Sequence, residues 1–224
     1  MEIADNIIRT KLKNVYFIWG RGKTTVANIL QNKYGCCIFS TDEARDRNIA
    51  FACPEYQPFM CRNFEKEYGV NSFWEFPKEV ISDREEHFLQ EVTPMIVADL
   101  IALSSQYETV ICEGDIDYLA IIPVAEHFVY LNNCGTKFDW FNRPDHENIV
   151  DITNKRTDLT DEEKAAVIQN AYDAVSGNEG VIPDWAVENG VKVISWDDSV
   201  TAEETAAETA EYFGLDKQVN ISLK

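Results

Sequence analysis

Residues 15–25 read VYFIWGRGKTT, an apolar run rich in β-branched and aromatic residues, then a glycine turn, then Lys-Thr-Thr. Apolar residues at helical spacing follow in the segment 26–30. This pattern predicts a strand, a tight turn and the start of a helix. Backbone N–H groups of such a turn point at bound phosphates, a lysine adds a charge, and a hydroxyl can ligate magnesium. The residues that we assign to a nucleotide-phosphate site are Gly20, Gly22, Lys23, Thr24 and Thr25.

The predicted phosphate loop is short. The full signature has four residues between its two glycines, whereas only Arg21 separates Gly20 from Gly22. The loop therefore holds the β-phosphate more weakly or has a cradle that is completed from elsewhere in the chain. An ordinary strand-to-helix turn is the alternative, and the flanking strand and helix patterns favour the phosphate site.

Composition is typical of a compact enzyme. The chain has 224 residues, of which 45% are hydrophobic and 12% aromatic, enough to build one α/β domain over residues 1–224 with a lid or insertion. Lys and Arg number 20 and Asp and Glu 39, which gives a net charge of −19 and disfavours nucleic acid and anionic membranes as partners. A polyanionic nucleotide then needs the few positive residues gathered at its pocket, together with magnesium.

Cysteine and hydropathy patterns predict a cytoplasmic protein with free thiols. No signal-peptide pattern is visible in residues 1–14, and no apolar run is long enough to span a bilayer. None of the six cysteines forms a Cys-x-x-Cys pair, and the three histidines lack the spacing of metal ligands. We therefore expect no structural zinc site.

Four more short apolar runs, separated by helical stretches, follow the first strand at residues 36–39, 109–112, 127–131 and 191–195. Such runs predict a buried parallel sheet, in which functional groups gather at the carboxyl ends of the strands. The second run is followed by Asp42 and Glu43, and the third by Glu113-Gly114-Asp115.

Three helices are also predicted. Thr160 and Thr201 each stand three residues before a glutamate, which is the capping-box pattern of a helix start. Residues 83–105 carry apolar side chains near helical spacing, and Pro94 is expected to bend this helix or to divide it in two.

This order of elements resembles the P-loop small-molecule kinases, the group that includes shikimate, gluconate, adenylyl-sulfate and nucleotide kinases. The resemblance implies a P-loop NTPase fold, an α/β architecture with a doubly wound parallel five-stranded sheet flanked by helices and a helical substrate or lid insertion. It also implies ATP as donor, magnesium, and transfer of the γ-phosphoryl group to a small acceptor. On this basis we place a helical acceptor-binding insertion at 44–106 and a lid-like segment at 135–158.

The resemblance also implies residue roles. An acidic residue after the second strand meets the acceptor hydroxyl or the metal in these kinases, and Asp42 matches that position. Glu113 matches a second acidic motif that positions magnesium, where aspartate is more common, with Asp115 and Asp117 together as the alternative. Arg143 and Arg156 match lid arginines that neutralise charge on the transferred phosphoryl group.

The acceptor pocket is expected around the scarce positive charges of the insertion. These candidates are Arg45, Arg47 and Arg62, with Glu43 beside them in sequence. Guanidinium groups suit an acceptor that carries carboxylate or phosphate. Other interpretations are a helix cap or solvated turn for Asp42 and surface ion pairs for the arginines.

The resulting hypothesis is a kinase that phosphorylates a small hydroxylated metabolite, nucleoside or antibiotic-like compound with ATP and magnesium. A different class remains: a non-catalytic module that binds or senses a nucleotide. The shortened loop and a glutamate at position 113 favour that second class.

Overall fold

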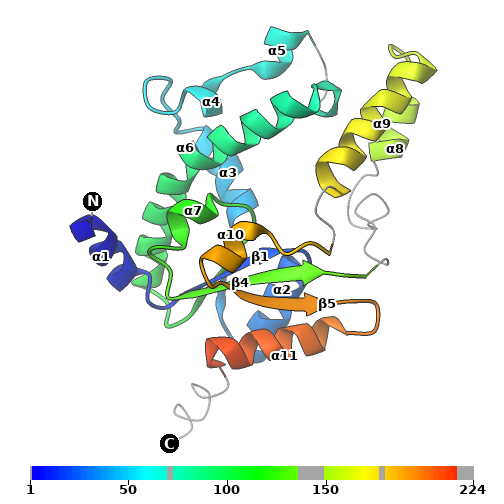
Figure 1. The fold of residues 1–224 in the computed structure, drawn as a ribbon. Helices are drawn as coiled ribbons and strands as arrows, with labels where there is room; N and C mark the ends of the chain where they lie inside the picture. The colour runs from blue at the N-terminus through cyan, green and yellow to red at the C-terminus, as the bar shows by residue number, and fades with distance from the viewer. Residues whose placement is uncertain (1, 70–72, 136–148, 177–179, 216–224) are drawn as a thin grey trace, which may run out of the picture.

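The computed structural model describes residues 2–69, 73–135, 149–176 and 180–215 (Figure 1). Five strands form one sheet in the order β2-β3-β1-β4-β5, and every neighbouring pair is parallel. The strands are β1 (Val15–Gly20), β2 (Cys37–Ser40), β3 (Val110–Glu113), β4 (His127–Asn133) and β5 (Lys192–Trp196). Each coincides, within one or two residues at either end, with a predicted apolar run.

The strand order makes β1 the centre of the sheet. The connection from β1 leads to β2 on one side, whereas the connection from β4 leads to β5 on the other. Connections that diverge in this way leave a crevice outside the carboxyl ends of the two strands, which is where open α/β sheets bind ligands. The prediction of a doubly wound, five-stranded parallel α/β fold is confirmed, and the turn at residues 20–25 follows the carboxyl end of β1.

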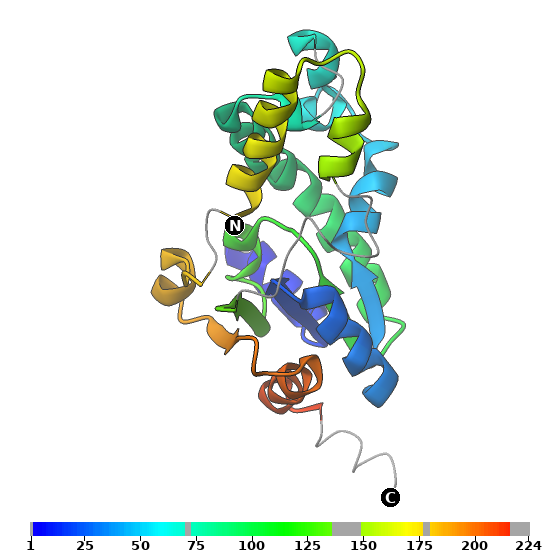
Figure 2. The same ribbon diagram turned by 90° about the vertical axis from the view of Figure 1, so that its right-hand side faces the viewer.

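Helices cover both faces of the sheet (Figures 1 and 2). In β1, Val15 and Phe17 point to one face and Tyr16 and Ile18 to the other, and all four side chains are buried. The second face carries α2 (Lys23–Tyr34) and α11 (Ala202–Phe213). The first carries α1 (Glu2–Lys11), α6 (Lys78–Ser104), α7 (Tyr118–Ile121) and α10 (Asp184–Glu188).

A group of helices extends beyond the sheet, at the top of both views (Figures 1 and 2). It contains α3 (Thr41–Ile49), α4 (Pro58–Cys61), α5 (Phe64–Tyr68), the 3₁₀ helix η1 (Phe73–Glu75), α8 (Ile149–Lys155) and α9 (Asp161–Ser176). The Asn170 amide on α9 donates to the carbonyls of Trp74 and Phe76, so α9 is tied to η1 and to the segment before α6. The described residues of 44–106 are helical or irregular and contain no strand.

Pro94 does not divide the long helix, because α6 is one continuous helix of 27 residues. Proline lacks the N–H that would close one helical hydrogen bond. Burial of one side of the helix offsets that loss. Four of its side chains, spaced four residues apart, lie in the core on the first face of the sheet: Phe88, Val92, Ile96 and Leu100. Among the described helices, none is both long enough and apolar enough to cross a bilayer.

Both predicted capping boxes are present. The Thr160 N–H donates to Glu163 Oε2 at 2.7 Å, and the Glu163 N–H donates back to Thr160 Oγ1 at 3.3 Å. The corresponding bonds between Thr201 and Glu204 measure 2.9 and 3.2 Å. These reciprocal bonds satisfy N–H groups that have no partner inside the helix, and they fix the starts of α9 and α11.

Candidate phosphate-binding site

The turn after β1 requires glycine at two positions. Gly20 has φ +99° and Gly22 φ +86°, a backbone region that residues with a Cβ rarely adopt. A Cβ on Gly20 would also lie 2.2 Å from the Leu131 carbonyl oxygen of β4, which accepts a hydrogen bond from the Arg21 N–H at 3.1 Å. The turn is therefore packed directly against the backbone of β4.

The helix α2 begins at Lys23, with Gly22 as its N-cap. The Val26 N–H donates to the Gly22 carbonyl at 3.0 Å, which is the first bond of the helix. The N–H groups of residues 22–25 precede that bond, and no acidic residue lies in the first turn. Such a helix start attracts anions through its N–H groups and its dipole. This geometry is consistent with the predicted roles of Gly20, Gly22, Lys23, Thr24 and Thr25.

Two carboxylates from the end of β3 contact the start of α2. Glu113 is only 3% exposed, and its Oε2 accepts a hydrogen bond from Thr24 Oγ1 at 2.7 Å. Lys23 Nζ lies 3.5 Å from Asp115 Oδ1, and the Asp115 side chain is about half exposed. Asp117, by contrast, caps α7 by accepting from the N–H groups of Leu119 and Ala120. Lys23 and Thr24, the first two residues of α2, thus each contact a carboxylate.

Parallel pairing explains how Glu113 reaches this place. Residue 113 is in register with Ile18 of β1 and with Ser40 of β2, so the end of β3 lies between the phosphate turn and the start of α3. The sequence shows carboxylates at the ends of β2 and β3, but the order of the strands, and hence their adjacency, is not visible in the periodicity. The pairing of Lys23 with Asp115 was not anticipated.

The donor set around Thr24 suits magnesium. A hydroxyl and a carboxylate oxygen 2.7 Å apart are the hard oxygen ligands that this ion prefers. Within the part of the chain that the structure describes, no group of three or more His, Cys, Asp or Glu side chains could hold a metal. Magnesium bound by Thr24 and Glu113 would take its other ligands from phosphates and water, as is usual for this ion.

Asp42 and Glu43 lie in the first turn of α3 and are exposed. The N-cap of this helix is Ser40, so the interpretation of Asp42 as the N-cap residue is wrong. Asp42 follows Ser40 by two residues, and Ser40 is paired with Glu113 in the sheet. An acidic side chain in the first turn of a helix is favoured by the helix dipole.

A buried hydroxyl that sequence reasoning missed lies next to Asp42. Thr41 is fully buried, and its Oγ1 has no hydrogen-bond partner among the described atoms. A Cβ on Gly114, where φ is +122°, would lie 2.0 Å from that oxygen. Close packing between Thr41 and Gly114 therefore fixes the start of α3 against the loop that carries Glu113 and Asp115. Only the glycine between two acidic residues hints at this contact in the sequence.

The three arginines predicted to bind the acceptor form ion pairs within the helical insertion. Arg45 pairs with Glu85 at 2.9 Å, Arg47 with Asp99 at 2.7 Å, and Arg62 with Glu67 at 2.7 Å. Arg45 also lies over the ring of Phe88 and Arg62 over that of Phe64. Each guanidinium thus already has a carboxylate partner within the insertion.

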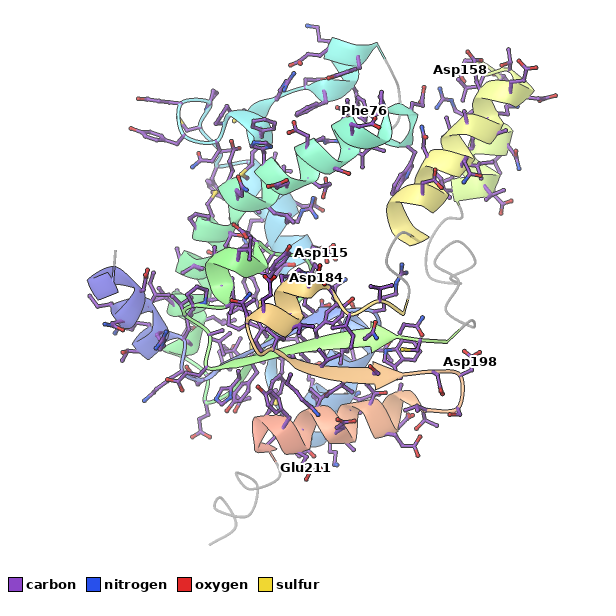
Figure 3. The ribbon with its side chains drawn as sticks, viewed as in Figure 1. Phe76, Asp115, Asp158, Asp184, Asp198 and Glu211 are labelled. Carbon is purple, nitrogen blue, oxygen red and sulfur yellow. The ribbon has the colours of Figure 1, made fainter. Side chains whose placement is uncertain are left out.

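Arg156 follows α8 and forms ion pairs with Glu75 and Asp158, and we call these three residues the clasp. Its Nη1 donates to Glu75 of η1 at 2.8 Å and its Nε to Asp158 at 2.7 Å. These hydrogen bonds raise the pKa of Arg156 above its ordinary value and lower that of Asp158 to about 2. Figure 3 shows Asp158 at the end of α9 that is away from the sheet. Arg143, the other predicted lid arginine, lies outside the described residues.

Comparisons with known proteins find similar solved structures but no matching sequence. No protein-family model matches the chain, and no curated protein sequence matches it. Among solved structures, the chain is similar to dephospho-CoA kinase from Campylobacter jejuni, with a TM-score of 0.40 and 13% identity over 90% of this chain and 96% of that chain. At this level of similarity no substrate and no residue role is carried over to the present chain.

Proposed function

We propose that this protein binds ATP at residues 20–25 and transfers the γ-phosphoryl group to a small hydroxylated acceptor: a metabolite, nucleoside or antibiotic-like compound. One observation carries the proposal. The start of α2 brings its first N–H groups, the Lys23 ammonium and the Thr24–Glu113 pair to one turn at the carboxyl edge of the sheet. Such a turn is suited to bind the phosphates of the donor together with magnesium, with the acceptor hydroxyl in line with the transferred phosphoryl group.

Lys23 would exchange its carboxylate partner for phosphate. Its pair with Asp115 is 3.5 Å long, and the aspartate is 48% exposed. Exposed pairs of this kind contribute only about 0–1 kcal/mol, whereas charge-assisted bonds to phosphate in a sheltered cradle are stronger. Asp115 then keeps the ammonium oriented toward the carboxyl edge until the nucleotide arrives.

Asp42 would orient or deprotonate the attacking hydroxyl. It lies in the first turn of α3, and the helices from α3 onward build the insertion that we propose as the acceptor site, residues 44–106. Arg45, Arg47, Arg62 and Glu43 are proposed to contact the acceptor. Residues 135–158 are proposed as the lid, with Arg143 and Arg156 stabilising charge on the transferred group. Magnesium, held by Thr24 and Glu113, would offset charge on the donor phosphates.

Replacing Glu113 with glutamine should change the magnesium dependence of turnover. Glutamine keeps an acceptor for the Thr24 hydroxyl but removes the negative charge. We expect the magnesium concentration at half-maximal rate to rise about 10- to 100-fold, as for other losses in the ligand shell of a metal. ADP release measured at fixed ATP over a magnesium series gives this value. Glu203→Gln, at an exposed glutamate of α11, is the matched control, and an unchanged magnesium curve for Glu113→Gln would remove Glu113 from the metal site.

Replacing Arg156 with alanine should lower turnover more than ATP affinity, because the guanidinium interaction strengthens as charge develops in the transition state. The clasp supplies the control. Glu75→Gln weakens the same ion pair but keeps the guanidinium, so it should lower the melting temperature while turnover stays near the wild-type rate. Equal losses of turnover in Arg156→Ala and Glu75→Gln would instead make Arg156 a purely structural residue.

A second candidate function is nucleotide binding without turnover. The specific observation in its favour is the short turn, in which Lys23 and Thr24 already contact Asp115 and Glu113. Steady-state ADP release with a panel of hydroxylated acceptors separates the two candidates when calorimetry has first shown ATP binding. A kinase releases ADP in an acceptor-dependent manner, whereas a sensing module binds ATP and releases none.

A further inference from the structure

The phosphate turn is hydrogen-bonded to residues of two other strands, β4 and β5. Arg21 is its central residue, and the Arg21 N–H donates to the Leu131 carbonyl of β4 at 3.1 Å. The Arg21 carbonyl accepts a hydrogen bond from the indole Nε1 of Trp196 at 3.2 Å. Both backbone groups of the central residue are thus bonded to the sheet rather than to the turn itself.

The ring of Trp196 also lies near Gly22. A Cβ placed on Gly22 would lie 3.4 Å from Cζ2 and 3.7 Å from Cε2 of the indole. Gly22 is the N-cap of α2, so the ring lies beside the residue from which the helix starts. Trp196 therefore holds the turn by its hydrogen bond to Arg21 and lies next to it at Gly22.

Trp196 is itself fixed by the sheet. It is the last residue of β5 and is in register with Asn133 of β4, and its carbonyl accepts a hydrogen bond from the Cys134 N–H at 2.8 Å. The indole extends from this anchored position across the edge of the sheet to the turn after β1. A side chain 175 residues away in sequence thus contacts the turn.

We infer that Trp196 is a positioning residue for nucleotide phosphates, which completes a cradle that the short turn cannot form alone. The full signature has three more residues between its glycines, and their backbone wraps around the phosphate. In this protein the indole compensates for part of the missing loop. Its hydrogen bond to the Arg21 carbonyl holds the peptide group between Arg21 and Gly22 in place before the ligand binds. Preorganised N–H groups bind an anion more tightly because less order has to be imposed on binding. This inference rests on the proposed phosphate site.

Two variants separate the hydrogen bond from the packing. Trp196→Phe keeps a ring near Gly22 and removes the indole N–H, while Trp196→Leu removes the ring as well. Loss of one such hydrogen bond should weaken binding of magnesium-ATP and of inorganic triphosphate by about 3- to 10-fold. Trp196→Leu should weaken both further. Trp74→Phe, the same substitution in η1, is the control and should leave both affinities unchanged.

The experiment measures both dissociation constants by calorimetry and the melting temperature of each variant, with Lys23→Ala alongside. Weaker triphosphate binding in Trp196→Phe at an unchanged melting temperature supports the inference. If wild type binds triphosphate, Lys23→Ala loses binding and Trp196→Phe binds as wild type does, the positioning role is overturned and the phosphate site stands. If wild type binds neither ligand, the proposed function fails and this inference fails with it.

A measurement on the unmodified protein covers the case in which the Trp196 variants do not fold. The Trp196 indole N–H bonded to Arg21 should give an NMR signal that shifts when triphosphate is added, because the acceptor carbonyl belongs to the turn. The Trp74 indole signal should stay in place. A Trp196 signal that does not move at saturating triphosphate would overturn the inference.

Discussion

Lys23→Ala is expected to lower the rate of phosphoryl transfer by about 10²- to 10³-fold, the usual effect of removing one group that stabilises developing charge. The lysine is the only cationic side chain within residues 22–25, at the start of α2. In the wild-type protein its ammonium is held 3.5 Å from Asp115 and has to move only to a phosphate at the same turn. ADP release measures the rate of transfer, and titration with ATP by calorimetry measures the affinity for ATP.

Lys33→Ala is the matched control for this variant. Lys33 lies in the last turn of the same helix and is exposed, so its removal changes the net charge equally but not the phosphate turn. We expect wild-type turnover for Lys33→Ala and a melting temperature near that of wild type for both variants. Unaltered ATP affinity and turnover in Lys23→Ala would refute the phosphate-loop interpretation.

Asp42→Asn should keep ATP binding and lower the rate of transfer by about 10²- to 10⁴-fold, the range for loss of general acid–base help. Asparagine has nearly the same shape but cannot accept the proton of the attacking hydroxyl. Single-turnover measurements of transfer, with ATP binding measured separately, isolate the chemical step.

Asp46→Asn is the control for Asp42→Asn. Asp46 is an exposed aspartate one turn further along α3, and it carries the same charge. It should retain full activity. If the two variants are equally active, Asp42 serves only to favour the start of the helix through the dipole.

The sheet was predictable because its signal is local. Buried parallel strands are short apolar runs, and each of the five runs in the sequence is a strand in the structure. The turn at 20–25 was predictable for the same reason, since glycine is required where φ is positive. Capping boxes are equally local, and both were found where Thr160 and Thr201 predicted them.

Long-range contacts at the site were not predictable in this way. Trp196 reaches Arg21, and Glu113 reaches Thr24, only because β5 and β3 take particular places in the sheet order. Periodicity identifies strands but not their neighbours. The alternative that Pro94 divides its helix in two is wrong for a related reason: the proline penalty is local, whereas the burial of α6 that offsets it comes from the whole core.

The arginines of the insertion also have long-range contacts that the sequence does not reveal. Scarce positive charge suggested that Arg45, Arg47 and Arg62 serve a ligand, yet each has a carboxylate of the helical insertion within 2.9 Å. In a chain with 39 acidic residues, internal partners are abundant. Their roles toward an acceptor therefore stay a prediction, as does that of Arg156.

The central claim is that nucleotide phosphates bind at the start of α2. Backbone amide NMR tests it directly, because an anion accepting hydrogen bonds shifts the N–H signals that bind it. On titration with magnesium-ATP, the largest shifts should fall on the amides of Gly22, Lys23, Thr24 and Thr25, and they should be lost in Lys23→Ala. Saturable shifts that leave residues 22–25 unchanged and cluster elsewhere would contradict the account.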